Sequence, residues 1–274
     1  FLVWTNYSLQ DVDAARLEDY RQHLLDSNKS ISTVNDYLGV VRKLYNFLHL
    51  QYDIKNIALG LTNEKVEHEE LAKKPQTVAQ VHKVLEYSNS LNLRDKLIIN
   101  LLYATALRTI EIHRMLIGDI EQEGDSTIIK VQRKGKSKKK GIIVLAEPLA
   151  DMLAEYLKTI DNDAAKPLFA SSSNNSKGKP LSTRTISGIM KKALRATIIK
   201  VPSSDKLYTA HSVRHTALGT LKDAKVGQVL LGHQSILTTE KFYSDQDRTE
   251  ERITNAPEKK LAAIYYPNYS TPAV

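Results

Sequence analysis

The sequence predicts a mainly α-helical protein with a small β-sheet, organised as two domains. Apolar residues recur at helical spacing along most of the 274 residues. Short β-branched runs that suit strands are confined to positions 126–145. A charged and polar segment separates the first helices from the rest of the chain, and we interpret it as an interdomain linker.

The N-terminal segment is predicted to be a small helical bundle. Asp13 can cap a first helix, and Ser32 or Thr33 can cap a second. From about Leu61 to Pro75 the residues are charged or polar, so the linker is expected there. The apolar positions of the two helices are Leu17, Tyr20, Leu24 and Leu25, then Val34, Tyr37, Leu38, Val41, Leu44, Tyr45 and Leu48.

The second domain is predicted to form around one apolar helix. Thr77 begins a first helix, and the later segment 97–107 is apolar nearly all round, which indicates burial at the centre of the domain. Arg108 follows directly, and a guanidinium beside so apolar a helix is costly unless it is paired. Glu111 is the nearest partner, and these residues alone slightly favour a structural ion pair over a ligand-binding role.

A β-hairpin is expected from residues 126–132 and 141–145, which are joined by a strongly basic turn. The plain interpretation of most lysines in that turn is a solvated loop. The helices after Pro148 and from Thr183 are expected to be scaffold. The second of these has basic residues that could line a phosphate backbone, namely Arg184, Lys191, Lys192 and Arg195.

Composition limits the function classes. The formal net charge of +8 favours a polyanionic partner such as nucleic acid, although charge alone does not decide this. The absence of cysteine excludes disulfides, thiolate metal sites and a cysteine nucleophile, and it fits a reducing cytoplasm. No apolar run approaches the roughly 20 residues that span a bilayer. We therefore expect a cytoplasmic protein that is neither secreted nor bound to a membrane.

A cluster of chemically active residues lies in the last third of the chain. His211, Arg214 and His215 have the spacing i, i+3 and i+4, which places them on adjoining parts of one helical face. Farther on, the segment 229–243, VLLGHQSILTTEKFY, contains His233 and Tyr243. A lone helical histidine is more often structural. Together, however, guanidiniums, imidazoles and a phenol suit attack on a phosphodiester.

The order and spacing of ATALRTIEI, HSVRH and LLGHQSILTTEKFY resemble the tyrosine recombinase family of site-specific DNA integrases and resolvases. The turn residue Lys134 followed by Gly135 resembles the family's hairpin lysine motif. Arg133 stands where a glycine is common, and Lys136 is the alternative to Lys134. The resemblance implies a catalytic set of Arg108, Lys134, His211, Arg214, His233 and Tyr243, supported by Glu111 and His215. One departure is a short interval between Arg214 and His233.

The mechanism that the resemblance implies is strand transfer through a 3′-phosphotyrosyl bond. Arg108 and Arg214 would stabilise charge on the phosphorane, while His211 would act as general base and later as general acid. His233 would donate a hydrogen bond to a non-bridging oxygen, and Lys134 would protonate the departing 5′ oxygen. Neither a cofactor nor a metal ion is expected, because the arginines do the work of a divalent ion.

The resemblance also implies a C-shaped clamp on DNA, with a helical core-binding domain at 1–66 and a catalytic domain at 67–274. The expected partners are double-stranded DNA with specific recombination sites, a homo-tetramer on paired sites, and accessory DNA-bending or directionality proteins. The tail from about 250 to 274 is expected to dock on a neighbouring subunit, and folding back on its own domain is the alternative. Integration, excision or resolution of a mobile element or replicon, in association with the nucleoid, would be the role. A type IB topoisomerase and a catalytically silent DNA-binding protein are the rival interpretations.

Overall fold

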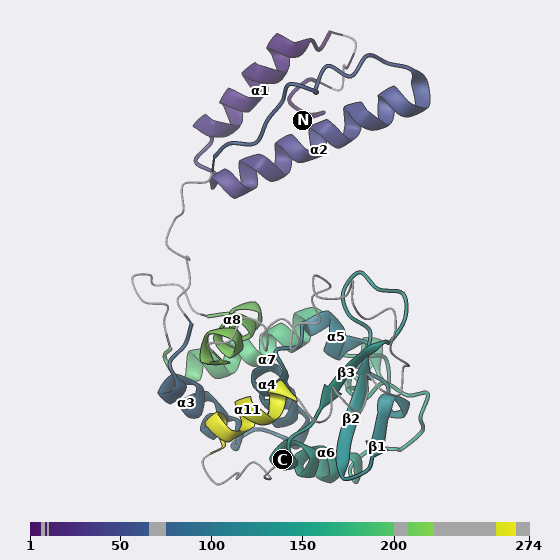
Figure 1. Cartoon of the computed structure of the whole chain (residues 1–274), viewed down its shortest axis with the longest axis vertical. Helices are drawn as coiled ribbons and strands as arrows, with labels where there is room; N and C mark the ends of the chain where they lie inside the picture. The colour runs from purple at the N-terminus through teal and green to yellow at the C-terminus, as the bar shows by residue number, and fades with distance from the viewer. Residues whose placement is uncertain (7–8, 10, 66–74, 200–207, 222–255, 267–274) are drawn as a thin grey trace. The chain divides into compact units, whose positions relative to one another are not determined.

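The computed structural model describes residues 1–6, 9, 11–65, 75–199, 208–221 and 256–266 (Figure 1). The chain divides into two compact units, Phe1–Ala72 and Lys73–Val274. The boundary expected after residue 66 falls in the segment 66–74, which lies outside the described residues. Within the described ranges, no helix is long and apolar enough to cross a bilayer.

The N-terminal unit consists of two helices, α1 (Ala14–Asp26) and α2 (Ile31–Tyr52). Asp13 caps α1 as predicted, because its carboxylate accepts a hydrogen bond from the Arg16 N–H at 2.8 Å. The predicted cap of α2 is wrong. Ser30 caps this helix and accepts the Thr33 N–H, so Ser32 and Thr33 lie within the first turn.

The core of this unit is the apolar stripe shared by the two helices, and most of the predicted positions are buried in it. Tyr37 is an exception, since it is 44% exposed. The segment that begins at Leu61 is not yet a linker. Leu61 is buried, and Glu64 is held by an ion pair with Arg21 and by a 2.7 Å hydrogen bond from its N–H to Asn35. Residues 61–65 therefore belong to the packed unit.

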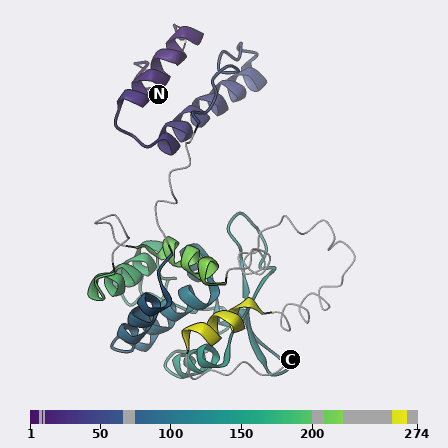
Figure 2. The ribbon, with the colours of Figure 1, turned by 60° about the vertical axis from the view of Figure 1, so that its left-hand side comes forward.

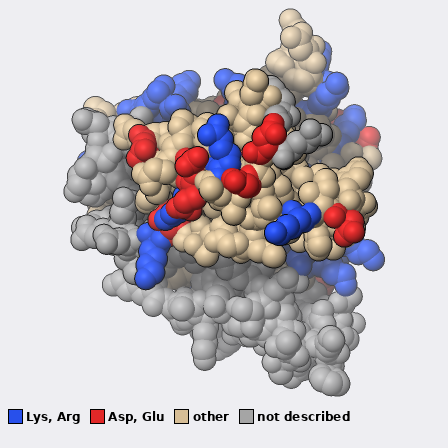
Figure 3. Space-filling model, turned by 90° about the horizontal axis from the view of Figure 1, so that it is seen from above, with Lys and Arg blue, Asp and Glu red and all other residues tan. Residues whose placement is uncertain are grey.

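The surface charge of the described residues is mixed on one face of the molecule. Figure 3 shows acidic and basic side chains interspersed there with uncharged ones. An anion on this face would therefore meet charges of both signs, so the positions of individual cations decide where it can bind.

The C-terminal unit is built around α4 (Leu93–Thr105), as the sequence predicts. Every side chain from Leu97 to Thr105 is buried. The helix is surrounded by α3 (Val78–Ser88), α6 (Glu147–Leu157), α7 (Thr183–Ala196), α8 (Ala210–Leu221) and α11 (Pro257–Tyr265) (Figure 2). Thr77 caps α3 in a capping box with Gln80, which confirms the predicted start.

A three-stranded antiparallel sheet in the order β1-β2-β3 lies beside these helices. The strands are β1 (Ile120–Glu123), β2 (Ser126–Val131) and β3 (Gly141–Val144). The predicted hairpin is the β2–β3 pair, in which Ile129 lies opposite Ile143. Strand β1 was not predicted, because three of its four residues, IEQE, are polar and the strand is at most partly buried. The fold class of helices with a small sheet is confirmed.

Three short helical segments complete the described part of this unit. Helix α5 (Thr109–His113) follows α4, and the 3-10 turns η1 (Ile117–Asp119) and η2 (Asn174–Ser176) lie in loops. The chain enters this unit against α8. The Gln76 N–H donates to Thr216 Oγ1 at 3.2 Å, and a Cβ built on Gly219 would lie 2.7 Å from the ring of Pro75.

Helix α11 belongs to the tail from about 250 to 274, and it packs against α3, α4 and α8 of its own chain. Leu261 is fully buried, Tyr265 shares a 3.1 Å hydrogen bond with Thr220, and the Tyr266 hydroxyl donates to Asn100 Oδ1 at 2.8 Å. Residues 257–266 therefore pack on their own chain, and docking of the tail on a neighbouring subunit stays a prediction. Residues 250–255 and 267–274 of the tail lie outside the described ranges.

Candidate active site

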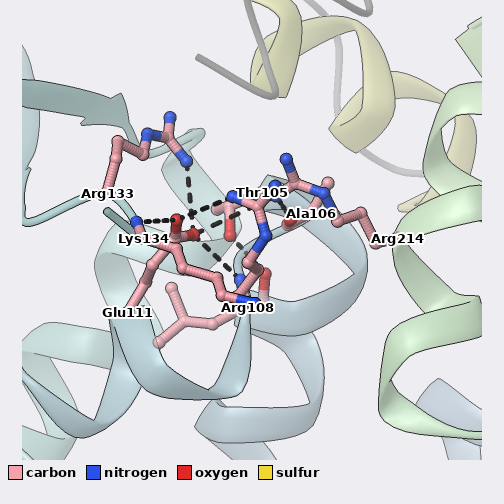
Figure 4. A network of polar contacts seen from close by, with 8 residues as sticks. Thr105, Ala106, Arg108, Glu111, Arg133, Lys134 and Arg214 are labelled. Carbon is pink, nitrogen blue, oxygen red and sulfur yellow. Dashed lines mark hydrogen bonds and ion pairs between the residues drawn. The ribbon is translucent and has the colours of Figure 1, made fainter. Parts of the chain in front are cut away.

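The buried carboxylate of Glu111 is the centre of a polar cluster at the end of α4 (Figure 4). Ala106 ends α4 with a positive φ of 50°, and the chain turns there into α5. Glu111 Oε2 accepts the Arg108 N–H at 2.9 Å, and Oε1 lies 3.1 Å from Arg108 Nη1. The predicted ion pair between Arg108 and Glu111 is present.

Three further groups reach the same carboxylate. Arg133 Nη1 lies 3.5 Å from Oε2, and the Lys134 N–H donates to Oε1 at 3.2 Å. Arg214 Nη1 lies 4.0 Å from Oε2 and donates to the carbonyl of Ala106 at 2.6 Å. We call Arg108, Glu111, Arg133, Lys134 and Arg214 the Glu111 cluster. It joins residues from α5, the β2–β3 turn and α8, which are far apart in the sequence.

The charges of this cluster are unequal, since three guanidiniums surround one carboxylate. Burial by itself raises the pKa of Glu111. The hydrogen bond from the Arg108 N–H and the charge of Arg133 outweigh that effect, so the pKa lies below its usual value. Burial, and then the charge of Arg108, lower the pKa of Arg214 to about 10, which leaves it charged at neutral pH. An anion placed beside the three arginines would be strongly stabilised.

The cluster differs in exposure from one cation to the next. The side chain of Arg108 is 27% exposed, whereas that of Arg214 is 5% exposed. Arg108 is therefore accessible to a ligand from solvent, while Arg214 is held from behind by the Ala106 carbonyl. A guanidinium that is held by such a hydrogen bond keeps a defined orientation of its plane.

The histidines of α8 lie on its outer side. His211 and His215 are exposed, and their rings meet edge to face with centroids 5.2 Å apart. The spacing alone suggested that His211, Arg214 and His215 share one face of the helix. Arg214 is buried, however, so its side chain points away from the two exposed imidazoles. The turn of the helix directs the guanidinium inward to Glu111 and both imidazoles outward.

Some predicted residues cannot be placed. His233 and Tyr243 lie outside the described residues.

Lys134 and Lys136 both have exposed side chains, but only the Lys134 backbone contacts Glu111. Tyr265 is buried, and burial raises its pKa to about 12. Among the residues that the structure describes, no group of three His, Asp or Glu side chains could hold a metal ion.

The burial of the Arg133 side chain against Glu111 was not predicted from the sequence. Arg133 was noted only as a departure from a glycine within a solvated turn, yet its side chain is 10% exposed and faces Glu111. A signal was available, because Arg133 follows the apolar strand directly and precedes the lysines of the turn. The identity of its partner could not be read, since Glu111 lies on another element.

Residues 74–250 match the model of the phage integrase family. The match spans more than half of the chain and includes the Glu111 cluster. The chain belongs to the phage integrase family. It is 28% identical over 258 residues to tyrosine recombinase XerD of Staphylococcus haemolyticus, covering 88% of this chain and 81% of that protein. It is 32% identical over 216 residues to XerA of Pyrococcus furiosus, covering 77% and 69%.

Solved structures share the fold of this tyrosine recombinase. The XerH site-specific recombinase bound to a palindromic difH substrate matches with a TM-score of 0.64 and 20% identity, over 90% of this chain and 73% of that one. A lambda integrase dimer bound to a COC′ core site matches with a TM-score of 0.61 and 16% identity, over 84% and 81%. The chain is thus an enzyme of the tyrosine recombinase type, and its relatives do not favour a topoisomerase.

Proposed function

We propose that this recombinase cuts and rejoins DNA strands at specific sites through a covalent 3′-phosphotyrosyl bond to Tyr243. The observation that carries the proposal is the convergence of three guanidiniums on one buried carboxylate. A purely structural ion pair needs one cation for each carboxylate. The larger positive charge suits a site whose second anion is the scissile phosphate.

Arg108 and Arg214 are the phosphate ligands in this proposal. Arg108 is held by Glu111 and Arg214 by the Ala106 carbonyl, so the positive charge and the planar shape of each guanidinium have a fixed place beside the proposed phosphate. Because both cations are fixed before the substrate arrives, they stabilise the charge of the phosphorane with little reorganisation. Glu111 acts through them as a positioning residue.

The remaining residues move protons. A phenol with a pKa near 10 is a weak nucleophile at neutral pH, so His211 takes the proton of Tyr243 as its oxygen attacks phosphorus. The bond from phosphorus to the 5′ oxygen breaks, and Lys134, or alternatively Lys136, protonates that oxygen. His233 donates a hydrogen bond to a non-bridging oxygen, and His215 supports His211. In the reverse direction, a 5′ hydroxyl of the partner strand displaces the tyrosine, so no cofactor is consumed.

The partners follow from this chemistry. Exchange between two duplexes needs four cuts, so we propose a homo-tetramer on paired DNA sites, with the unit before residue 66 as a core-binding domain. Accessory proteins that bend DNA would set the direction. Integration, excision or resolution of a mobile element is the corresponding role.

One experiment tests the proposal. The protein is incubated with supercoiled plasmids that carry or lack candidate sites, and with nicked suicide substrates that trap covalent intermediates. Adducts and recombinant products that depend on the site are expected. Relaxation of both plasmids without recombinants would instead identify a topoisomerase. Binding with no adduct would identify a catalytically silent DNA-binding protein.

A further inference from the structure

Arg133 occupies an unusual position at the end of β2. Its side chain is buried, whereas the next five residues of the turn, 134–138, are exposed. Removing a guanidinium from water is costly, and the nearby Glu111 carboxylate offsets the cost. The turn is therefore not a uniformly solvated basic loop, since its first cation is packed into the protein.

The opposite strand is shaped to admit this side chain. Gly141 lies opposite Val131 in the β2–β3 register. A Cβ at position 141 would lie 2.9 Å from Val131 Cγ2, 3.0 Å from Arg133 Nε and 3.1 Å from Arg133 Cγ. These distances are shorter than an ordinary van der Waals contact, so glycine at 141 leaves room for the side chains of both Val131 and Arg133.

The turn after Arg133 is fixed at two points on one carboxylate. The Arg133 carbonyl accepts the Lys136 N–H at 3.0 Å, and Gly135 has a φ of 82°, as position i+2 of a type II turn requires. Arg133 Nη1 faces Glu111 Oε2 at 3.5 Å, while the Lys134 N–H donates to Oε1 at 3.2 Å. The backbone of Lys134 is thus held between two attachments to α5 (Figure 4).

We infer that Arg133 is a positioning residue that fixes the β2–β3 turn on Glu111 and thereby places the Lys134 amine beside the leaving 5′ oxygen. This role rests on the proposed function of Lys134 as the proton donor. A flexible turn would let the amine sample many positions, and proton transfer requires a donor within hydrogen-bond distance. Arg133 contributes the side-chain attachment, which the backbone N–H of Lys134 alone does not supply.

The structural part of the inference is tested by hydrogen exchange without any substrate. In Arg133→Gln, the amide of Lys134 should exchange at least several-fold faster than in the unaltered protein. Lys138→Gln removes the same charge from an exposed position of the same turn, and it should leave that amide unchanged. Equal protection of Lys134 in Arg133→Gln and in the unaltered protein would overturn the inference.

The chemical part is tested with two suicide substrates, one with the normal 5′ bridging oxygen and one with sulfur there. Arg133→Gln should cleave the oxygen substrate about 10- to 100-fold more slowly, the size of effect that misplaced groups produce. Its loss on the sulfur substrate should be much smaller, because a thiolate leaves without a proton and only the contribution of the Arg133 charge to the phosphate site is then missing. Equal losses on both substrates would overturn the inference, since they would place Arg133 on the non-bridging oxygens.

Two further variants keep the test decisive. Arg133→Lys retains the charge and should recover part of the rate on the oxygen substrate. If Arg133→Gln does not fold, Arg133→Lys is used in its place. Lys134→Ala tests the proposed function itself. If sulfur fails to rescue Lys134→Ala, Lys134 is not the proton donor, and the exchange measurement still decides whether Arg133 fixes the turn.

Discussion

The carboxylate of Glu111 binds both the backbone N–H and the guanidinium of Arg108, at 2.9 and 3.1 Å. A single side chain therefore sets the start of α5 and the direction of the cation next to it. The backbone bond resembles half of a capping box, in which the third residue of a helix returns to its cap. Local helix stability and the geometry of the proposed phosphate site thus depend on the same group.

Glu111→Gln should damage both properties. The amide keeps the shape but leaves three guanidiniums without their anion, so we expect a loss of about 2–4 kcal/mol in the free energy of unfolding. DNA cleavage should fall by at least about tenfold, because Arg108 loses its orientation. Urea unfolding and single-turnover cleavage measure the two effects. Glu155→Gln, at an exposed position of α6, is the control, and an equal effect there would contradict the prediction.

The stabilisation from Glu111 should depend on pH. Its pKa is lower in the folded protein than the ordinary value of 4.5, so its contribution is complete above that value and is lost as the pH falls through the folded pKa. The difference in unfolding free energy between the unaltered protein and Glu111→Gln should therefore shrink below about pH 4.5. Urea titrations at several pH values measure this difference. A constant difference would show that the carboxylate charge is not responsible.

Tyr243→Phe should bind DNA almost normally and form no covalent complex. Only the hydroxyl is removed, so the proposed phosphate ligands stay in place. Denaturing gels with a nicked suicide substrate detect the adduct, and a mobility shift measures binding. Tyr265→Phe is the matched control, and it should retain the adduct because its hydroxyl is buried beside Thr220. An adduct that persists in Tyr243→Phe would remove Tyr243 as the nucleophile.

Replacing Arg108 or Arg214 by alanine should lower the cleavage rate by about two to four orders of magnitude, as expected for the loss of charge stabilisation in the transition state. Lysine should restore little, because a point charge cannot bind two oxygens as a planar fork does. Single-turnover rates on suicide substrates measure the effect. Rates near normal in either alanine variant would identify that arginine as part of a structural ion pair only.

Leu261→Ala should destabilise the C-terminal unit by about 2–4 kcal/mol, because it leaves a cavity under α11. The loss should be the same at all protein concentrations, since the helix packs on its own chain. Thermal unfolding at several concentrations measures this, with Ala263→Ser at an exposed position of α11 as the control. A destabilisation that varies with concentration would show that the helix docks on a neighbouring subunit.

The sequence was most informative where the structure follows from local patterns. Segment 97–107 is apolar on nearly all sides, which favours a helix at the centre of the domain, and its residues are buried as expected. Glu111 lies three residues after Arg108, so their pairing could be anticipated from helical spacing. The capping residues Asp13 and Thr77 were identified for the same reason, because a cap depends on neighbours in the chain.

What the sequence could not predict depends on contacts between distant segments. Arg133 is buried only because α5 brings Glu111 to the end of β2, and a basic turn gives no sign of that. The inward direction of Arg214 depends on the carbonyl of Ala106. Likewise, α11 has an apolar face whose partner could be in the same chain or another one, and spacing does not distinguish the two.

The close approach of Gly219 to Pro75 links the entry of the chain into the C-terminal unit to the helix that bears Arg214. Any side chain at position 219 would have to displace either the proline or α8. The Gln76 N–H adds a hydrogen bond from the same entry segment to Thr216 of α8. The start of this unit is thus in direct contact with the helix that carries Arg214, a phosphate ligand in the proposed mechanism.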